Sequence, residues 1–121
     1  MKHLKIVFTL MAVLAASPAP AHETKGAHGG RIVDAGSHHV ELVVKDMDVS
    51  VFVTDSNDKK VKPTGFKALA IFTVGGKAQR IALVPADDKL GGKAETPLPT
   101  DVKGVVQLTA PDGKVSLGQF K

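Results

Sequence analysis

The sequence predicts an all-β domain, a small antiparallel β-sandwich of immunoglobulin-like size with about seven strands. Three observations indicate this fold class. Apolar and polar residues alternate with a period of two, most clearly over residues 38–45. Short β-rich segments are separated at regular spacing by turn-forming residues, and no segment after residue 30 has the period of a helix. An open β-barrel built from the same strands is the alternative.

Polar turns divide the first half of the domain. Residues 34–37, 46–48 and 55–58 are rich in Asp, Gly, Ser and Asn, which favour turns. Between them we expect extended segments at residues 31–33, 38–45 and 49–54. The alternation within residues 38–45 assigns two faces to that strand. One face carries His38, Val40, Leu42 and Val44, and the other carries His39, Glu41, Val43 and Lys45.

The second half begins with residues 66–74, which are β-rich and apolar on both faces, so a central strand is expected there. Gly75 and Gly76 predict a tight hairpin into residues 79–85. Residues 86–101 contain the pair Gly91-Gly92 and two prolines, and we expect a long crossing loop. Residues 102–110 and 114–120 are expected to form a final hairpin around a Pro-Asp-Gly turn.

The N-terminal residues 1–21 have the parts of a secretory signal peptide. Lys2 and Lys5 give a positive start, an apolar run follows over residues 6–16, and Ala19-Pro20-Ala21 fits the small-x-small cleavage pattern. Cleavage after Ala21 is expected, because earlier cleavage would place a proline directly after the scissile bond. The sequence thus predicts export through the Sec pathway to a bacterial periplasm, with no stable membrane anchor after cleavage.

The predicted mature chain has two parts. Residues 22–30 form a flexible segment rich in His and Gly, and residues 31–121 form the β-sandwich domain. Loss of Lys2 and Lys5 from 16 basic residues leaves 14 against 12 acidic ones, so the net charge falls from +4 to +2. Because this charge is mixed along the chain, nucleic-acid binding is not expected.

Composition also restricts the chemistry. The chain has no Cys, so it can form no disulfide, thiolate metal site or Cys nucleophile. Ser37, His38 and Asp34 lie too close together in sequence to reach the geometry of a catalytic triad. No motif supports an enzyme activity, and none is predicted.

The histidines are the most informative feature of the sequence. All those of the predicted mature chain fall within residues 22–39, at positions His22, His28, His38 and His39. Imidazole is the commonest protein ligand for late first-row metals. With no Cys, and with Met47 the only Met after residue 21, the available donors are imidazole, carboxylate and the amino terminus. These donors suit Cu(II), Zn(II), Ni(II) or Co(II), and the expected cofactor is a divalent transition metal, Cu(II) or Zn(II).

His22 and His28 lie in the N-terminal segment. If cleavage follows Ala21, the α-amine and imidazole of His22 can chelate one ion, and a further imidazole would complete a histidine brace. His28 lies between Gly26-Ala27 and Gly29-Gly30, which allow the backbone to fold back as a ligand. For both residues the alternative is a solvated position with no ligand role.

His38 and His39 are adjacent, so on a strand they point to opposite faces. His38 shares its face with Val40, and we expect it at the edge of the core. His39 shares its face with Glu41, about 7 Å away along the strand. His39 and Glu41 are a candidate ligand pair on the exposed face, for which a solvated polar face is the alternative. The candidate metal ligands are therefore His22, His28, His39, Glu41 and His38.

Three short segments carry a family resemblance: Ala-His-Gly-Gly-Arg-Ile-Val at residues 27–33, His-Val-Glu-Leu-Val at 39–43 and Val-Phe-Val-Thr-Asp at 51–55. They resemble small exported proteobacterial proteins associated with heavy-metal efflux. They are also similar to the N-terminal stretch of periplasmic adaptor subunits of heavy-metal RND efflux pumps. The resemblance implies periplasmic metal binding or delivery, with His28, His39 and Glu41 as the matching positions and a pump adaptor as the partner. The chain departs from Met- and Trp-based Cu(I) carriers, since it has no Trp.

Two functions of different classes follow. The first is a periplasmic metal-binding protein that buffers copper or zinc, or delivers it to an efflux or resistance system. The second is a structural or protein-interaction β-sandwich whose histidines are incidental. Stoichiometric metal retention after desalting distinguishes the two.

Overall fold

Nine β-strands make up the part of the chain that the structure describes, residues 24–121 of this computed structural model. They are β1 (Thr24–Lys25), β2 (Arg31–Ala35), β3 (His38–Lys45), β4 (Asp48–Asp55), β5 (Lys67–Val74), β6 (Lys77–Ala86), β7 (Lys89–Lys93), β8 (Lys103–Thr109) and β9 (Val115–Phe120). Within this range no helix is long and apolar enough to cross a membrane. The predicted signal peptide, residues 1–21, and the candidate ligand His22 lie outside the described residues.

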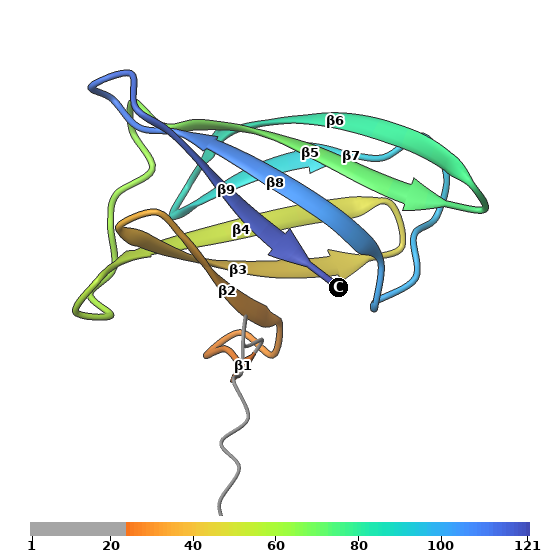
Figure 1. Ribbon diagram of the computed structural model, residues 1–121, viewed down its shortest axis with the longest axis horizontal. Helices are drawn as coiled ribbons and strands as arrows, with labels where there is room; N and C mark the ends of the chain where they lie inside the picture. Colours follow the sequence, from red (N-terminus) through yellow and green to blue (C-terminus); the bar gives the residue numbers. More distant parts are fainter. Residues whose placement is uncertain (1–23) are drawn as a thin grey trace, which may run out of the picture.

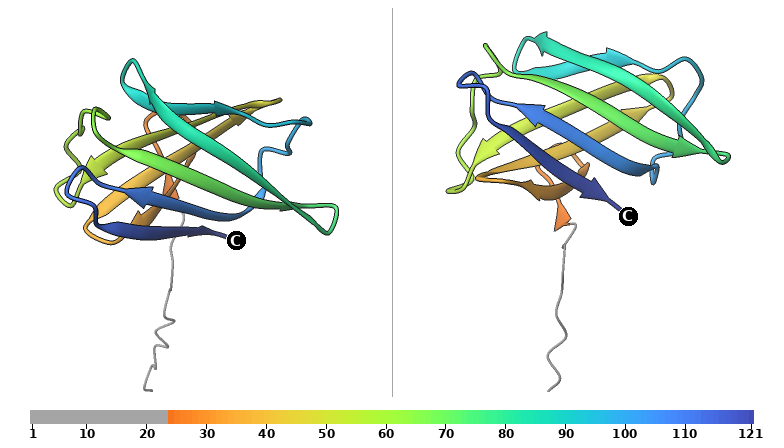
Figure 2. Two further views of the ribbon diagram at one scale, coloured as in Figure 1. Left: turned by 90° about the horizontal axis from the view of Figure 1, so that it is seen from above. Right: turned by 45° about the horizontal axis from the view of Figure 1, so that its top comes forward.

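The strands form one antiparallel sheet that curls back on itself, in the order β1-β2-β3-β4-β7-β6-β5-β8-β9 (Figure 1). The curl brings β9 alongside β2, near the opposite end of the strand order (Figure 2). The predicted all-β class is confirmed, and the curled sheet is consistent with both an open barrel and a sandwich. The predicted central strand is also confirmed, because β5 pairs with β6 on one side and β8 on the other.

Turn chemistry explains the most regular hairpin. Val74 and Lys77 face each other across a two-residue turn, in which Gly75 and Gly76 have φ values of 60° and 81°. A two-residue turn with two successive positive φ values has a backbone twist that matches the twist of the two flanking strands. Glycine adopts these φ values without a steric cost. The predicted hairpin at this position is confirmed.

The stretch expected to be a long loop, residues 86–101, contains a strand instead. β7 occupies its first part and pairs with both β4 and β6. Gly91 and Gly92 lie in this strand rather than in a turn, and a Cβ on Gly92 would collide with the carbonyl oxygen of Ala82. Gly92 therefore marks a close approach of two backbones, which a sequence pattern does not distinguish from a turn.

The core confirms the alternation predicted for β3. Val40, Leu42 and Val44 are buried and face inward, together with alternate residues of the other long strands. Phe72 of β5 and Phe120 of β9 are the largest fully buried side chains. The core lies inside the curl of the sheet, so the alternate residues of β2, β3 and β4 point outward.

A close contact between β9 and β2 completes the curl. A Cβ on Gly118 of β9 would lie 2.9 Å from Val33 and 3.0 Å from Val40, so glycine lets β9 pack against β2 and β3. The Arg31 guanidinium lies 5.2 Å from the centre of the Phe120 ring, and Arg31 donates a hydrogen bond to the carbonyl of Val102 (2.6 Å). Among the strand pairings of residues 24–121 none joins β2 to β9, so side chains hold this contact.

The end of β4 stays paired with β3 but extends beyond its pairing with β7. Residues 48–51 pair with β7, whereas Thr54 forms an isolated bridge with Lys60. The backbone N–H of Val61 also donates to the carbonyl of Val53 (3.1 Å). The loop after β4 is therefore held against the outer edge of the strand, where it forms one wall of the groove described next.

Candidate functional site

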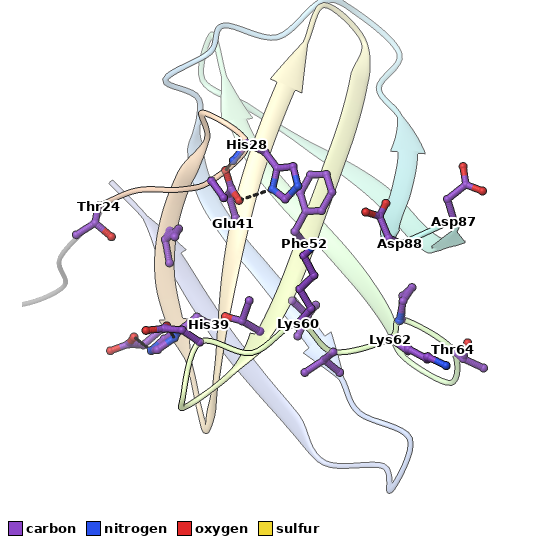
Figure 3. A pocket seen from close by; sticks show the side chains of 18 residues that line it. Thr24, His28, His39, Glu41, Phe52, Lys60, Lys62, Thr64, Asp87 and Asp88 are labelled. Atoms are coloured by element: carbon purple, nitrogen blue, oxygen red, sulfur yellow. Dashed lines mark hydrogen bonds and ion pairs between the residues drawn. The ribbon is translucent and has the colours of Figure 1, made fainter.

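A broad groove of about 1120 Å³ lies over the outer side of β2, β3 and β4 (Figure 3). Ile32, Glu41 and Phe52 line it from these three strands. Its walls come from the N-terminal residues 24–28, the loop at residues 58–64 and the β6–β7 turn at Asp87 and Asp88. Histidines, carboxylates and lysines are thus gathered around an apolar floor.

Glu41 is buried at the edge of this groove, with only 5% of its surface exposed. Its Oε2 accepts hydrogen bonds from the backbone N–H groups of His28 (2.9 Å) and Gly30 (2.8 Å). Its Oε1 lies 2.8 Å from Nδ1 of the His28 ring. A buried carboxylate is costly unless it is hydrogen-bonded, and here both oxygens are used. Glu41 therefore ties the N-terminal segment to the sheet.

His28 is held in one orientation by two contacts. Its ring stacks on Phe52, with the ring centres 3.6 Å apart and the planes 5° from parallel. The hydrogen bond from Nδ1 to Glu41 sets the rotation of the ring (Figure 3). Because a carboxylate only accepts hydrogen bonds, the proton of a neutral His28 lies on Nδ1 and the lone pair on Nε2. The ring is about one-third exposed, so the structure presents a fixed imidazole at the groove.

The structure corrects two expectations for this region. Residues 24–30 are not a free segment, because Thr24 and Lys25 pair with Ile32 and Arg31 of β2 and Gly26 closes the turn by donating to the carbonyl of Gly30 (2.8 Å). Glu41 is not exposed, although it does lie on the outer face of β3. The covering hairpin has no period-two pattern, so its docking could not be read from the alternation.

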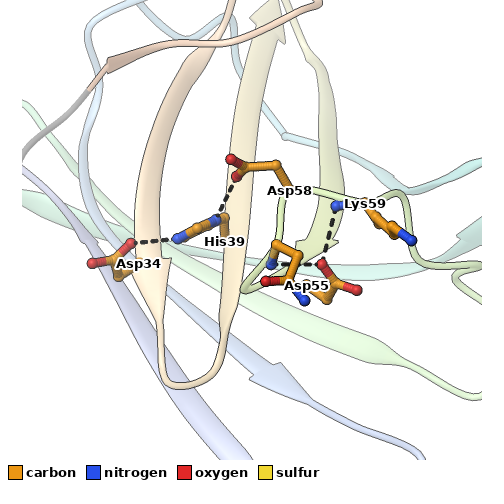
Figure 4. A network of polar contacts seen from close by, with 6 residues as sticks. Asp34, His39, Asp55, Asp58 and Lys59 are labelled. Atoms are coloured by element: carbon orange, nitrogen blue, oxygen red, sulfur yellow. Dashed lines mark hydrogen bonds and ion pairs between the residues drawn. The ribbon is translucent and has the colours of Figure 1, made fainter.

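His39 also lines the groove, away from the contact of His28 with Glu41, and it contacts two aspartates (Figure 4). Its Nε2 lies 3.0 Å from Asp34 of β2, and its Nδ1 lies 3.1 Å from Asp58 in the loop after β4. Both ring nitrogens are therefore occupied by carboxylates, and Glu41 bonds to His28 instead. The predicted pairing of His39 with Glu41 is not formed, because each residue finds a nearer partner from another segment.

His38 points to the opposite side of β3, as the alternation predicts. Its ring packs edge-on against Phe66, with centres 5.5 Å apart and planes at 85°. Phe66 belongs to the buried core, so His38 lies at the core edge, away from the groove. It also lies near the neighbouring turn, where it is the smallest of the contributions that lower the pKa of Asp55.

Asp55 begins the turn that carries Asp58 to His39. Its Oδ1 accepts hydrogen bonds from the backbone N–H groups of Lys59 (3.0 Å) and Asn57 (2.8 Å) (Figure 4). These two bonds, that from Lys59 first, lower the pKa of Asp55 below its ordinary value of 3.8, and the charges of Lys59 and His38 add to the effect. The ionised form is favoured because it is the better acceptor.

We expect Asp55→Ala to lower the melting temperature at neutral pH and to matter less in acid. The folded-state pKa lies below that of the unfolded chain, so the ionised carboxylate stabilises the fold above about pH 3.8. That contribution is lost as the pH falls through the folded-state value. Melting curves of both proteins between pH 7 and pH 2 should therefore converge in acid, and a constant difference would contradict this origin of the stability.

The candidate ligands are not gathered into one cluster in the described part of the chain. Within residues 24–121 no group of three or more His, Asp or Glu side chains is arranged to hold one ion. The structure brings His28 and Glu41 together, keeps His39 in a separate contact, and turns His38 away. The role of Phe52 was not predicted, although the sequence contains a signal for it. The turn between β3 and β4 sets a strand register in which Phe52 lies across from Glu41.

Comparisons with protein-family models, with curated proteins and with solved structures found no match for this chain.

Proposed function

We propose that this protein is a periplasmic metal-binding protein that holds Cu(II) or Zn(II) through Nε2 of His28. It would buffer the metal or deliver it to an efflux or resistance system, with a pump adaptor as the partner. The observation that carries the proposal is the geometry of His28. Its Nδ1 is hydrogen-bonded to a buried carboxylate, its partly exposed ring lines the groove, and within residues 24–121 its Nε2 has no hydrogen-bond partner.

Metal-binding histidines almost always donate their second ring N–H to a carboxylate, a carbonyl or water. That bond sets the tautomer, orients the ring and makes the free nitrogen a better ligand. Glu41 has this relation to His28, and the stacking on Phe52 further restricts the ring. A ligand held in place before binding loses less entropy than a mobile one.

The remaining donors would come from the groove and from the chain before it. Thr24 lines the same groove as His28, and His22 precedes Thr24 by two residues in the sequence. If Ala21 is the cleavage site, the amine and imidazole of His22 add two donors. Asp87 and Asp88 line the facing wall and offer carboxylates. These donors suit a divalent metal.

The candidate ligands take different roles in this proposal. His28 and His22 bind the ion, and Glu41 is a positioning residue whose oxygens are already used. His39 keeps its contacts with Asp34 and Asp58 and does not bind the ion. His38 packs at the edge of the core and does not bind it either. No step of an enzymatic reaction is assigned to any of them.

The test compares two histidine variants by titration with Cu(II) and with Zn(II) at neutral pH. His28→Ala should weaken binding by roughly 100-fold, as expected for loss of an oriented ligand. His39→Ala is the matched control, because it removes a groove imidazole of similar exposure, and its affinity should stay near that of the parent. Melting curves of both variants establish that they are folded.

The alternative, a structural or interaction domain, makes the opposite prediction. Glu41 would then serve only to attach the N-terminal hairpin, and the free nitrogen of His28 would have no ligand. Desalted protein without stoichiometric metal, or equal affinity in the parent and His28→Ala, would rule out the proposed site and favour this alternative.

A further inference from the structure

The outer face of the second half of the sheet has no acidic residue. Strands β5, β6, β8 and β9 contain neither Asp nor Glu along their whole lengths. Six larger aliphatic side chains point outward from these strands: Leu69, Ile71, Val84, Val105, Val115 and Leu117. We call this surface the aliphatic face.

The register of the strands makes this face continuous. Leu69 lies across from Gln107 of β8, which lies across from Leu117 of β9, and Ile71 lies across from Val105. Val84, Val115 and Leu117 are 56%, 55% and 60% exposed, and they are three of the four large hydrophobic side chains classed as exposed within residues 24–121. Exposed apolar side chains gathered on one face mark a contact surface.

Positive charge accompanies the apolar residues. Lys67, Arg80 and Lys103 are exposed on the same face, where Arg80 faces Ile71 and Lys103 faces Thr73 in the neighbouring strands. None of the three forms an ion pair with another residue of the range 24–121. The nearest acidic side chains lie in the connections that border these strands, with Asp101 before β8, Asp112 between β8 and β9, and Asp87 and Asp88 after β6 at the groove.

We propose that the aliphatic face docks reversibly on the surface of an anionic lipid bilayer. Lysine and arginine side chains are attracted to anionic headgroups, and aliphatic side chains enter the boundary between headgroups and acyl chains. A face with cations, aliphatic groups and no carboxylate matches both parts of that surface. The proposal does not depend on metal binding, because the groove lies over other strands.

Two other occupants fit less well. A symmetric dimer through this face would bring the same three cations of each copy together without any acidic partner, which is unfavourable. The core of a protein interface is typically enriched in Trp, Tyr and Met and depleted in Lys. This chain has no Trp or Tyr, and two of the three cations on the face are lysines.

Sedimentation with lipid vesicles tests the proposal. The purified protein should bind vesicles that contain phosphatidylglycerol, bind vesicles of phosphatidylcholine alone much more weakly, and be released by salt. Arg80→Glu and Leu117→Glu should each reduce binding by roughly tenfold or more. Both side chains are exposed, so the variants should melt like the parent.

Lys45→Glu is the matched control, because it changes the net charge as Arg80→Glu does but lies at the end of β3. It should retain most of the binding. All variants share the same N-terminal residues, so differences among them report on the substituted face. Failure to bind anionic vesicles, or equal loss in Lys45→Glu, overturns the proposal. Dimerisation that Leu117→Glu abolishes, without vesicle binding, would instead assign the face to a protein contact.

Discussion

Glu41→Ala should release the N-terminal hairpin from the sheet and weaken metal binding by roughly 10–100-fold, because the His28 ring is no longer oriented. The substitution removes the acceptor of two backbone N–H groups and of the His28 ring. Leaving a buried donor unpaired costs about 1–3 kcal/mol. We therefore expect a loss of roughly 2–4 kcal/mol of unfolding free energy, or detachment of residues 24–30. Faster hydrogen exchange at the amides of His28 and Gly30 would identify the detachment.

Glu41→Gln separates the attachment of the hairpin from the tuning of the metal ligand. Glutamine keeps one oxygen for the two backbone N–H groups but turns an NH₂ group toward Nδ1 of His28. That nitrogen must then accept, so the ring proton moves to Nε2 and the lone pair leaves the groove. Metal affinity should fall by roughly 10–100-fold with much less loss of stability than in Glu41→Ala.

Nitrogen chemical shifts of the His28 ring report this change of tautomer directly. A purely structural role of Glu41 would leave the metal affinity of the glutamine variant unchanged even though the ring shifts report the new tautomer. That outcome would remove Glu41 from the metal site while leaving its role in attaching the hairpin intact.

Gly104→Ala should be among the most destabilising single substitutions in the domain. Gly104 lies in β8 between Phe72 and Phe120, the two largest fully buried side chains. A Cβ there would collide with the carbonyl oxygen of Ile71 and lie 2.9 Å from the Phe72 ring, at a φ of 155°. The colliding atom belongs to the backbone of β5, so relief requires the two strands to separate. We expect a cost of about 3 kcal/mol or more.

Gly91→Ala provides the control for this prediction. Gly91 also lies within a strand, but a Cβ there would be 3.8 Å from Ala86 and 3.9 Å from the carbonyl oxygen of Val49, which is ordinary contact. Its melting temperature should remain close to that of the parent, whereas Gly104→Ala should melt roughly 10 °C lower or more. Similar melting of the two variants would mean that β5 and β8 yield more easily than their packing indicates.

Local patterns predicted much of the fold. The alternation over residues 38–45 gave the limits of β3 and its inward face, and Gly75-Gly76 gave the hairpin between β5 and β6. β7 was missed because Gly91 and Gly92 indicate a turn in a sequence, whereas here Gly92 permits close packing. Whether a glycine marks a turn or a close packing contact depends on the neighbouring strand, and the local sequence does not contain that strand.

The candidate site was predictable only in part. The sequence singled out His28 and Glu41, but it placed them in different roles, one in a free segment and one on an exposed face. Their contact depends on the docking of a short hairpin, which involves hydrogen bonds to a side chain rather than periodic apolar burial. The partners of His39 come from β2 and from a distant loop, and no local pattern links them.

The contact between β2 and β9 bears on the order in which the strands could be connected along the chain. Arg31, where β2 begins, packs on Phe120, where β9 ends, so the first residue of one strand adjoins the last residue of the other. Side-chain packing and not a strand ladder joins these neighbours. A linker from the end of β9 to the start of the N-terminal hairpin at Thr24 would leave the core contacts and His28 in place, and new ends could be opened at the exposed turn of residues 111–113. The architecture therefore suits circular permutation, and equally insertion as a unit into a surface loop of another protein.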